Sequence, residues 1–160
     1  MTADTFIKRF MSLAFLIEKE SGIFAEAVLA QSALETGWGT HVKGNNYFGI
    51  KGKRQLVRTT EELNHPNAHF PEIISITPFE KNGSTWYKYD VRTWFDSYDN
   101  PIDSFRAYAT FIKSNPRYAK ALEQTTPEDY LTEVAAAGYG TGTDYGISLL
   151  DVLKSVKKRM

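Results

Sequence analysis

The feature that most constrains the fold is a change of pattern in the middle of the chain. Between residues 55 and 95, the segments QLVRTTEEL, EIISITPF and TWYKYDVRTWF are rich in β-branched and aromatic residues and partly alternate. This pattern is typical of β-strands. Asn82 and Gly83 lie between the second and third segments and are a strong signal for a two-residue hairpin turn. We therefore predict a small antiparallel β lobe over about residues 53–95.

Two helices are predicted before this lobe. Apolar residues recur every three or four positions through the first segment, which indicates an amphipathic helix that ends near residues 21–22. Charged residues interrupt the segment, so it lacks the continuous apolar region of a signal peptide. The second helix is predicted from about Phe24 to Thr36, with Gly37 and Gly39 as its stop signals.

Helices return after the lobe with clear start signals. Asn100 before Pro101, and Thr126 before Pro127, each combine a preferred capping residue with proline at the first helical position. A final helix is predicted within residues 143–158. The predicted fold class is therefore α+β, mostly helical, with the β lobe inserted between helices.

Composition fits one ordinary domain over residues 1–160. The chain is 42% hydrophobic and 24% charged, and its formal net charge is zero. The neutral balance argues against a nucleic-acid partner, because general nucleic-acid binding depends on neutralising phosphates. The absence of cysteine excludes disulfides and thiol chemistry. No apolar run approaches the roughly 20 residues that span a membrane, so we expect no membrane insertion, and we expect a monomer.

Glu35 is the only charged residue between Val28 and Thr40. On a helix it shares a face with Gln31 and Ser32. Partial burial and the partial negative charge of a helix end both disfavour an anion, so we expect the pKa of this carboxyl to be raised. A carboxyl group that stays protonated near neutral pH is what a general acid requires. A surface glutamate without a catalytic role is the alternative.

The segment GNNYFGIKG, residues 44–52, follows Glu35 closely. Its asparagines offer hydrogen-bonding amides, its aromatic residues offer rings that stack on sugars, and its glycines allow close backbone approach. A tight structural turn would use similar residues. With Glu35 beside it, the segment favours a carbohydrate-binding site.

Five motifs resemble a known family. AQSALETGWG, NNYFGIKG, TTE, FDSYDNPIDSFRAYATFIKSNPRYAKAL and AAAGYGTGTDYG occur in the order seen in glucosaminidase domains of bacterial cell-wall hydrolases, glycoside hydrolase family 73. This family includes the flagellar peptidoglycan hydrolase domain and many phage endolysins. The resemblance covers about residues 24–155. It implies a lysozyme-like fold, no cofactor, and hydrolysis of the β-1,4 bond between N-acetylglucosamine and N-acetylmuramic acid in peptidoglycan.

The resemblance also implies roles for particular residues. The family's catalytic acid corresponds to Glu35, and the tyrosine that lines its active site corresponds to Tyr139, whose alternative role is a ring of the core. The residues expected to bind substrate or form the wall of the site are Trp38, Asn46, Tyr47, Phe48 and Tyr118. Trp38 could equally be part of a buried scaffold.

A second carboxylate is expected on the β lobe, where the family places a glutamate after one or two threonines. Glu61 in RTTEEL has this position, while Glu80, Glu62 and Glu72 are alternatives because an apparent insert, NHPNAHFPE, makes the register uncertain. Glu61 and Glu62 cannot face the same side of a strand. The second carboxylate would activate water or stabilise the transition state, or the substrate's N-acetyl group would act as the nucleophile.

Other sites and functions are weighed against this one. His41, His65 and His69 lack a spacing that would organise a metal site, so no metal is expected. The alternative functions are a lytic transglycosylase or muramidase on the same scaffold, or a glycan-binding module without activity. The expected place of action is the cell wall or periplasm. Without a recognisable signal peptide, we expect a phage lysin or a truncated secreted protein.

Overall fold

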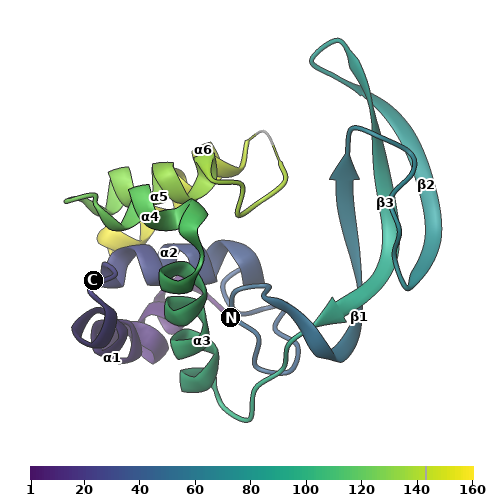
Figure 1. Ribbon diagram of the computed structural model, residues 1–160. Coiled ribbons are helices and arrows are strands. Elements are labelled where there is room, and N and C mark those ends of the chain that lie inside the picture. Colours follow the sequence, from purple (N-terminus) through teal and green to yellow (C-terminus); the bar gives the residue numbers. More distant parts are fainter. Residues whose placement is uncertain (143) are drawn as a thin grey trace. The chain divides into compact units, whose positions relative to one another are not determined.

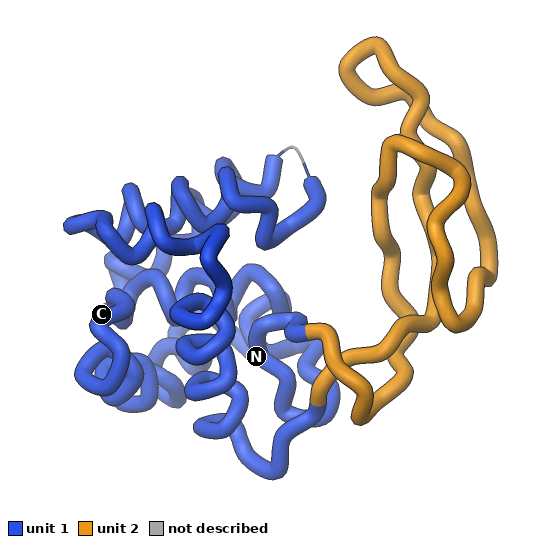
Figure 2. Tube along the Cα trace, in the orientation of Figure 1, with its two compact units in different colours: residues 1–50, 97–160 blue, residues 51–96 orange. Residues whose placement is uncertain are grey.

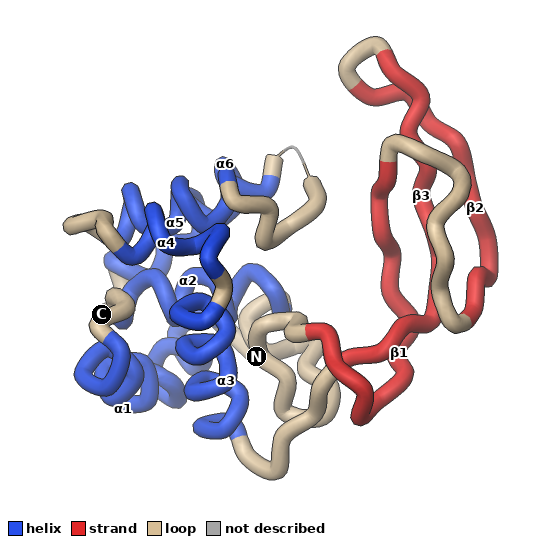
Figure 3. Tube along the Cα trace, viewed as in Figure 1, coloured by secondary structure: helices blue, strands red, loops and turns tan. Residues whose placement is uncertain are grey.

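The computed structural model describes residues 1–142 and 144–160, which fall into two compact units (Figure 2). The helical unit comprises residues 1–50 and 97–160, and the strand unit comprises residues 51–96. The predicted α+β class is confirmed, with all helices in one unit and the sheet in the other (Figures 1 and 3). That residues 1–160 act as one catalytic domain stays a prediction, so each unit is described by itself.

The helices occur where the sequence predicted them. Their bounds are α1 Ala3–Ser21, α2 Ala25–Thr36, α3 Pro101–Ser114, α5 Pro127–Ala136 and α6 Tyr145–Lys157. The 3-10 helix η1, Pro116–Tyr118, and the short helix α4, Ala119–Leu122, were not predicted, because neither is long enough to show a helical period. Thr143, the first residue of the predicted final segment, lies outside the described residues. Among the residues that the structure describes, no helix combines the length and apolar character that crossing a membrane requires.

The helix ends use the predicted capping residues. The side-chain oxygen of Asn100 accepts a hydrogen bond from the backbone N–H of Asp103 at 3.1 Å, and Thr126 accepts one from Asp129 at 3.1 Å. Each bond satisfies one of the N–H groups that the first turn of a helix leaves without a partner. At the other end, α1 stops at Gly22, whose φ of +80° suits a residue without a side chain.

The α2 helix is the centre of the helical unit. It is buried on nearly all sides, and it packs against α1, α5 and α6. Small residues such as Ala27, Ala30 and Ala33 allow this close approach. Because α2 is held on so many sides, the Glu35 backbone at its end has a fixed position.

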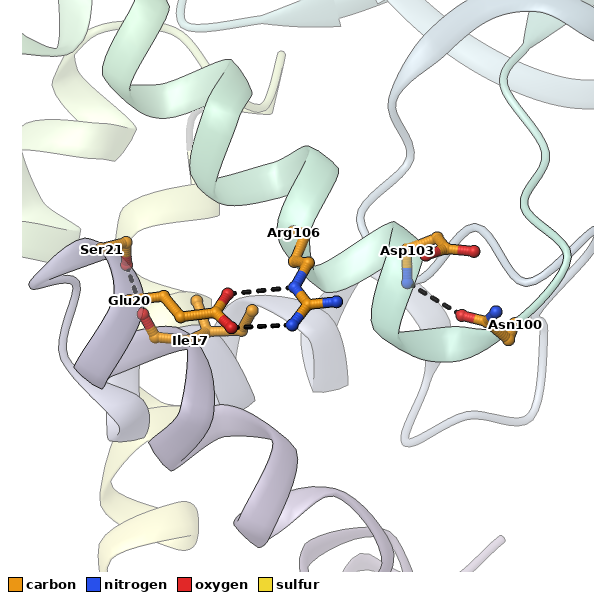
Figure 4. Close-up of polar contacts among 6 residues, drawn as sticks. All are labelled: Ile17, Glu20, Ser21, Asn100, Asp103 and Arg106. Carbon is orange, nitrogen blue, oxygen red and sulfur yellow. Dashed lines mark hydrogen bonds and ion pairs between the residues drawn. The ribbon is translucent and has the colours of Figure 1, made fainter.

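Two further contacts hold α3 against other parts of the helical unit. The ring of Phe48 stacks on Tyr108 of α3 at a centroid distance of 4.3 Å. Figure 4 shows that Arg106 of α3 donates two hydrogen bonds to the carboxylate of Glu20 in α1, at 3.0 and 2.7 Å. This pairing holds the pKa of Glu20 below its ordinary value, mainly through the hydrogen bonds from Arg106. It ties the C-terminal end of α1 to α3.

The strand unit is a three-stranded antiparallel sheet of order β1-β3-β2. Its strands are β1 Lys51–Leu63, β2 Glu72–Lys81 and β3 Ser84–Phe95. The predicted hairpin is confirmed: Asn82 and Gly83 join β2 to β3 with φ values of +51° and +77°. Positive φ at both turn residues is typical of the type I′ turns that match the twist of a hairpin.

The insert between β1 and β2 covers part of one face of the sheet. Tyr89 of β3 donates a hydrogen bond from its hydroxyl to the carbonyl of His65 at 2.9 Å and accepts one from the N–H of Ala68 at 3.2 Å. The ring of Phe70 lies 5.5 Å from the ring of Tyr89, centroid to centroid. The insert thereby buries Tyr89 and gives this small sheet a core of its own.

Candidate active site

Glu35 is the last residue but one of α2, and its side chain is half-buried. The hydroxyl of Tyr145 donates a hydrogen bond to Glu35 Oε1 at 2.8 Å. The other oxygen, Oε2, lies beside Gly49, where an added Cβ atom would come within 3.2 Å. The last turn of α2 carries no basic residue. Burial and the helix end therefore disfavour the anionic carboxylate, whereas the hydrogen bond from Tyr145 favours it.

The turn that follows Glu35 has an unusual backbone. Gly37, Trp38 and Gly39 all have positive φ values, of +56°, +57° and +77°. Such a conformation is uncommon for a bulky residue like tryptophan. The N–H of Trp38 donates to the carbonyl of Ala33 at 2.8 Å, and its ring packs edge-on against Phe6 of α1 at 5.8 Å. This is the scaffold role that the sequence left open, and contact between Trp38 and substrate stays a prediction.

The segment that contains Asn46, Tyr47 and Phe48 is buried. The side-chain oxygen of Asn46 accepts a hydrogen bond from the N–H of Ile50 at 3.1 Å, and its amide nitrogen donates to the carbonyl of Ile50 at 2.9 Å. The N–H of Tyr47 donates to Ser104 Oγ at 3.0 Å. These bonds organise the loop that carries Gly49, which supports the wall-forming part of the expectation. Direct contact with a glycan stays a prediction for all three residues.

Two tyrosines from the end of the chain lie against this segment and against Glu35. Tyr139 donates a hydrogen bond from its hydroxyl to the carbonyl of Phe48 at 2.7 Å, and its ring stacks on that of Tyr145 at 6.4 Å. Burial is the main cause that raises the pKa of both phenols, and the nearby charge of Glu35 raises it further. Both hydroxyls therefore keep their hydrogens and act as donors.

Tyr145 was quoted in a motif but was given no role by the sequence. The signal that could have found it is its place in the same motif as Tyr139, at the start of α6. Tyr118, by contrast, was given a substrate-binding role by the sequence, and the structure places it in the core. It has no exposed surface, and its ring packs against Phe111 at 5.7 Å and Tyr139 at 6.1 Å. It supports the ring of Tyr139, and its predicted substrate contact would require the ring to become exposed.

Each candidate for the second carboxylate has a partner within the strand unit. Glu61 pairs with Lys51 at 2.7 Å, and the ammonium group of Lys51 also lies 4.1 Å from the ring centroid of Phe95. The other contacts are Glu62 with Lys81 at 3.3 Å, Glu72 with Arg92 at 3.0 Å, and Glu80 with the hydroxyl of Thr85 at 2.9 Å. The partners alone do not single out one glutamate.

The register of the sheet separates these candidates by face. Glu61 lies opposite Tyr89 and Glu80 lies opposite Thr85, so both belong to the same face because side chains alternate along β3. Glu62 lies opposite Lys88, on the other face. The side chain of Glu61 is 18% exposed, against 38% for Glu62.

No metal site emerges from this arrangement. Among residues 1–142 and 144–160, no group of three or more His, Cys, Asp and Glu side chains is placed to hold a metal ion. His41, His65 and His69 are exposed, and Nδ1 of His65 accepts a hydrogen bond from the N–H of Asn67 within its own loop.

Comparison with known proteins shows which family the chain belongs to. The sequence model of the family Glucosaminidase, described as mannosyl-glycoprotein endo-beta-N-acetylglucosaminidase, matches residues 12–158. The chain belongs to the glucosaminidase family. The matched region includes Glu35, Glu61, Tyr139 and Tyr145.

A curated relative agrees with the glucosaminidase family. A protein named "Peptidoglycan hydrolase FlgJ" from Vibrio parahaemolyticus is 32% identical over 96% of this chain and 47% of its own length. The chain thus spans about half the length of the curated relatives that it matches.

Two solved structures share the fold of this chain. A peptidoglycan hydrolase mutant from Sphingomonas sp. A1 has a TM-score of 0.69 and 24% identity, with 98% of this chain and 97% of that chain covered. The catalytic domain of the autolysin Auto from Listeria monocytogenes has a TM-score of 0.66 and 22% identity, with 99% and 87% covered. At these identities the likeness shows the fold alone.

Proposed function

We propose that this chain is an endo-β-N-acetylglucosaminidase that hydrolyses the β-1,4 bond between N-acetylglucosamine and N-acetylmuramic acid in bacterial peptidoglycan, and that it acts at the cell wall or periplasm. The observation that carries the proposal is the family match over residues 12–158, which contains a half-buried helix-end carboxyl bonded to a tyrosine. A relative named as a peptidoglycan hydrolase supports the choice of substrate.

Glu35 is proposed as the general acid. Cleavage of a glycosidic bond needs a proton on the departing oxygen, and a carboxyl group held in one place by the end of a buried helix can deliver it. The close approach of Gly49 to Glu35 Oε2 supports the same role, because a larger residue there would crowd the carboxyl group. Tyr139 is proposed to line the site beside it.

Glu61 is proposed as the second carboxylate. It follows two threonines, as in the family motif, and it is less exposed than Glu62. It would activate the attacking water or stabilise positive charge on the sugar ring; where the substrate's N-acetyl group acts as nucleophile, Glu61 would only shape the site. Its ion pair with Lys51 would have to open or shift for Glu61 to reach a substrate.

Mass spectrometry of digested peptidoglycan tests the proposed reaction. Products with N-acetylglucosamine at the reducing end support it. Products ending in 1,6-anhydromuramic acid would show a lytic transglycosylase, and products ending in reducing N-acetylmuramic acid would show a muramidase. Sedimentation with cell walls and no released product would show a binding module. The variant Glu35→Gln, confirmed as folded by its melting curve, serves as the control for contaminating activity.

A further inference from the structure

A chain of hydrogen-bonded side chains, buried at Tyr130, Tyr108 and Gln31 and half-buried at Tyr145, runs through the helical unit to Glu35. Gln31 lies one helical turn before Glu35 on α2 and has no exposed surface. Both ends of its amide are bonded: Nε2 donates to the hydroxyl oxygen of Tyr145 at 3.3 Å, and Oε1 accepts from the hydroxyl of Tyr108 at 2.6 Å. Beyond Tyr108, the hydroxyl oxygens of Tyr108 and Tyr130 lie 2.8 Å apart.

The amide gives this chain a direction. A hydroxyl group has one hydrogen to donate. Tyr108 gives its hydrogen to Gln31, so the hydrogen between the two phenols must come from Tyr130. Tyr145 receives a hydrogen bond from Gln31, so its own hydrogen is directed to Glu35 Oε1. Every donor along the chain therefore points toward the carboxyl group.

The surroundings keep Tyr145 in the orientation that this requires. An added Cβ atom at Gly140 would come within 2.4 Å of the Tyr145 ring, so the backbone of Gly140 packs directly on the ring. The ring of Tyr139, stacked on that of Tyr145 at an interplanar angle of 12°, is a second constraint. The phenol of Tyr145 has little room to rotate away from Glu35.

The phenol groups of this hydrogen-bonded chain stay protonated across the pH range in which proteins fold. Burial is the largest cause that raises the pKa of Tyr108, Tyr130 and Tyr145 above the ordinary tyrosine value. The phenols of Tyr139 and Tyr145 lie against Glu35, whose nearby charge raises the pKa of both.

We propose that Gln31 is a positioning residue, whose buried amide fixes the direction of the chain from Tyr130 through Tyr108 and Tyr145 so that Tyr145 always donates to Glu35. Buried polar groups are costly, and an apolar core would serve the fold as well. A hydrogen-bonded chain that ends on a carboxyl group instead sets where that group lies and how readily it gives up its proton. The proposal rests on the proposed function only in the catalytic role that it gives to Glu35.

The test is a direct titration of the Glu35 carboxyl carbon by NMR in the whole folded chain without substrate. Removing a donor to a carboxylate disfavours its charged form, so Tyr145→Phe should move the titration midpoint upward by about one pH unit. Gln31→Met, which keeps the length but removes both amide bonds, should move it in the same direction by at least about 0.3 unit. In the Tyr145→Phe background, Gln31→Met should add almost nothing, because Gln31 acts through Tyr145.

A matched substitution distinguishes the effect of a residue's place in the chain from the effect of losing any buried hydroxyl. Tyr130→Phe also removes one buried hydroxyl, but at the far end of the chain, so it should move the midpoint less than Gln31→Met does. If Gln31→Met does not fold, Tyr108→Phe replaces it: the amide stays but loses the donor that orients it, and an upward shift is again expected. A midpoint unchanged in the Gln31 or Tyr108 variant, or full additivity with Tyr145→Phe, would overturn the proposal.

The two proposals fail in different ways. If Glu35→Gln still cleaves peptidoglycan while the midpoints move as expected, the catalytic role of Glu35 is wrong and the positioning by Gln31 stands. If Glu35→Gln is inactive and the midpoints do not move, the catalytic role stands and the positioning is wrong. Melting curves of every variant show whether a loss of activity reflects unfolding. Unfolding by itself would not shift the titration midpoint measured on folded protein.

Discussion

The helical unit and the strand unit are stabilised in different ways. The helical unit has a large apolar core with α2 at its centre, whereas Tyr89 and Val91 are the only fully buried side chains among the described residues of the strand unit. The sheet relies on its backbone hydrogen bonds, on the insert over Tyr89 and on exposed ion pairs such as Arg58 with Asp90 at 2.6 Å. Burial fixes a side chain more firmly than an exposed ion pair does.

The two candidate carboxylates differ in the same way, because one is held within the buried helical unit and the other by an ion pair of the sheet. Glu35 stands at the end of a buried helix and is held by a tyrosine that is itself bonded on its other side. Glu61 is held by a single lysine whose side chain is 52% exposed. As the proposed acid, Glu35 would therefore be pre-organised, and Glu61, as the proposed second carboxylate, would be able to exchange its partner for a substrate.

The largest expected effect is on activity. Glu35→Gln keeps the shape of the side chain but removes the proposed acid, so it should lower turnover by at least about 10²-fold, the scale of general acid catalysis. Turbidity loss of purified cell walls measures this. Its melting temperature should stay near that of the parent, and lysis at nearly the parent rate would show that Glu35 is not the acid.

A matched pair of isoleucines tests the difference in core. Ile112 has no exposed surface, whereas Ile76 on β2 is 39% exposed. Ile112→Ala should lower the free energy of unfolding by about 2–5 kcal/mol, because it leaves a cavity in a packed core. Ile76→Ala should cost less than about 1 kcal/mol. Urea denaturation measures both, and equal losses would mean that the sheet is as tightly packed as the helices.

The third effect separates the glutamates of the strand unit. Glu61→Gln should lose activity about 10-fold or more beyond Glu62→Gln or Glu80→Gln, because only Glu61 is the proposed partner of Glu35. All three variants should keep the parent melting temperature. An inactive Glu80→Gln beside an active Glu61→Gln would show that the hairpin end reaches the substrate. No effect at any of the three would favour the N-acetyl group as nucleophile.

Alkaline pH should act mainly on the helical unit. The phenols of Tyr108, Tyr130, Tyr139 and Tyr145 have pKa values raised by burial above the ordinary 10.0. Their stabilising effect is complete below that value and is lost as pH rises, because the unfolded chain ionises first. Each of these four phenols should therefore lower the free energy of unfolding by about 1.4 kcal/mol for every pH unit above pH 10.

Urea denaturation between pH 8 and pH 11 measures this slope. Tyr108→Phe removes one of the four phenols and should make the alkaline loss of stability visibly shallower, whatever its effect at pH 8. The same slope in parent and variant would contradict the assignment of the loss to buried phenols.

The smallest expected effect concerns an exposed ion pair of the sheet. Arg92 and Glu72 pair at 3.0 Å with about half of each side chain exposed. Arg92→Ala combined with Glu72→Ala should change the free energy of unfolding by less than about 0.5 kcal/mol. A double-mutant cycle at low and at high salt measures their coupling, and a large coupling that resists salt would show that this pair stabilises the sheet after all.

The local elements could be predicted from the sequence because their signals lie within a few residues. Asn100 and Thr126 cap their own helices, and Asn82 with Gly83 makes its own turn. The place of Glu35 near a helix end follows in the same way from Gly37. These features depend on backbone conformations that each residue type prefers, so neighbouring residues are enough to determine them.

The tertiary structure alone decided which side chains meet. Tyr145 reaches Glu35 across 110 positions of sequence, and Gln31 turns its amide to tyrosines of α3 and α6. Tyr118 is turned into the core, although its motif suggested a place at the substrate. Such contacts depend on how several helices pack around α2, and a small change in that packing would bring other residues together. The sequence determined the end of the helix that carries Glu35, the proposed acid, and only the packing of the whole helical unit determined which side chain donates a hydrogen bond to it.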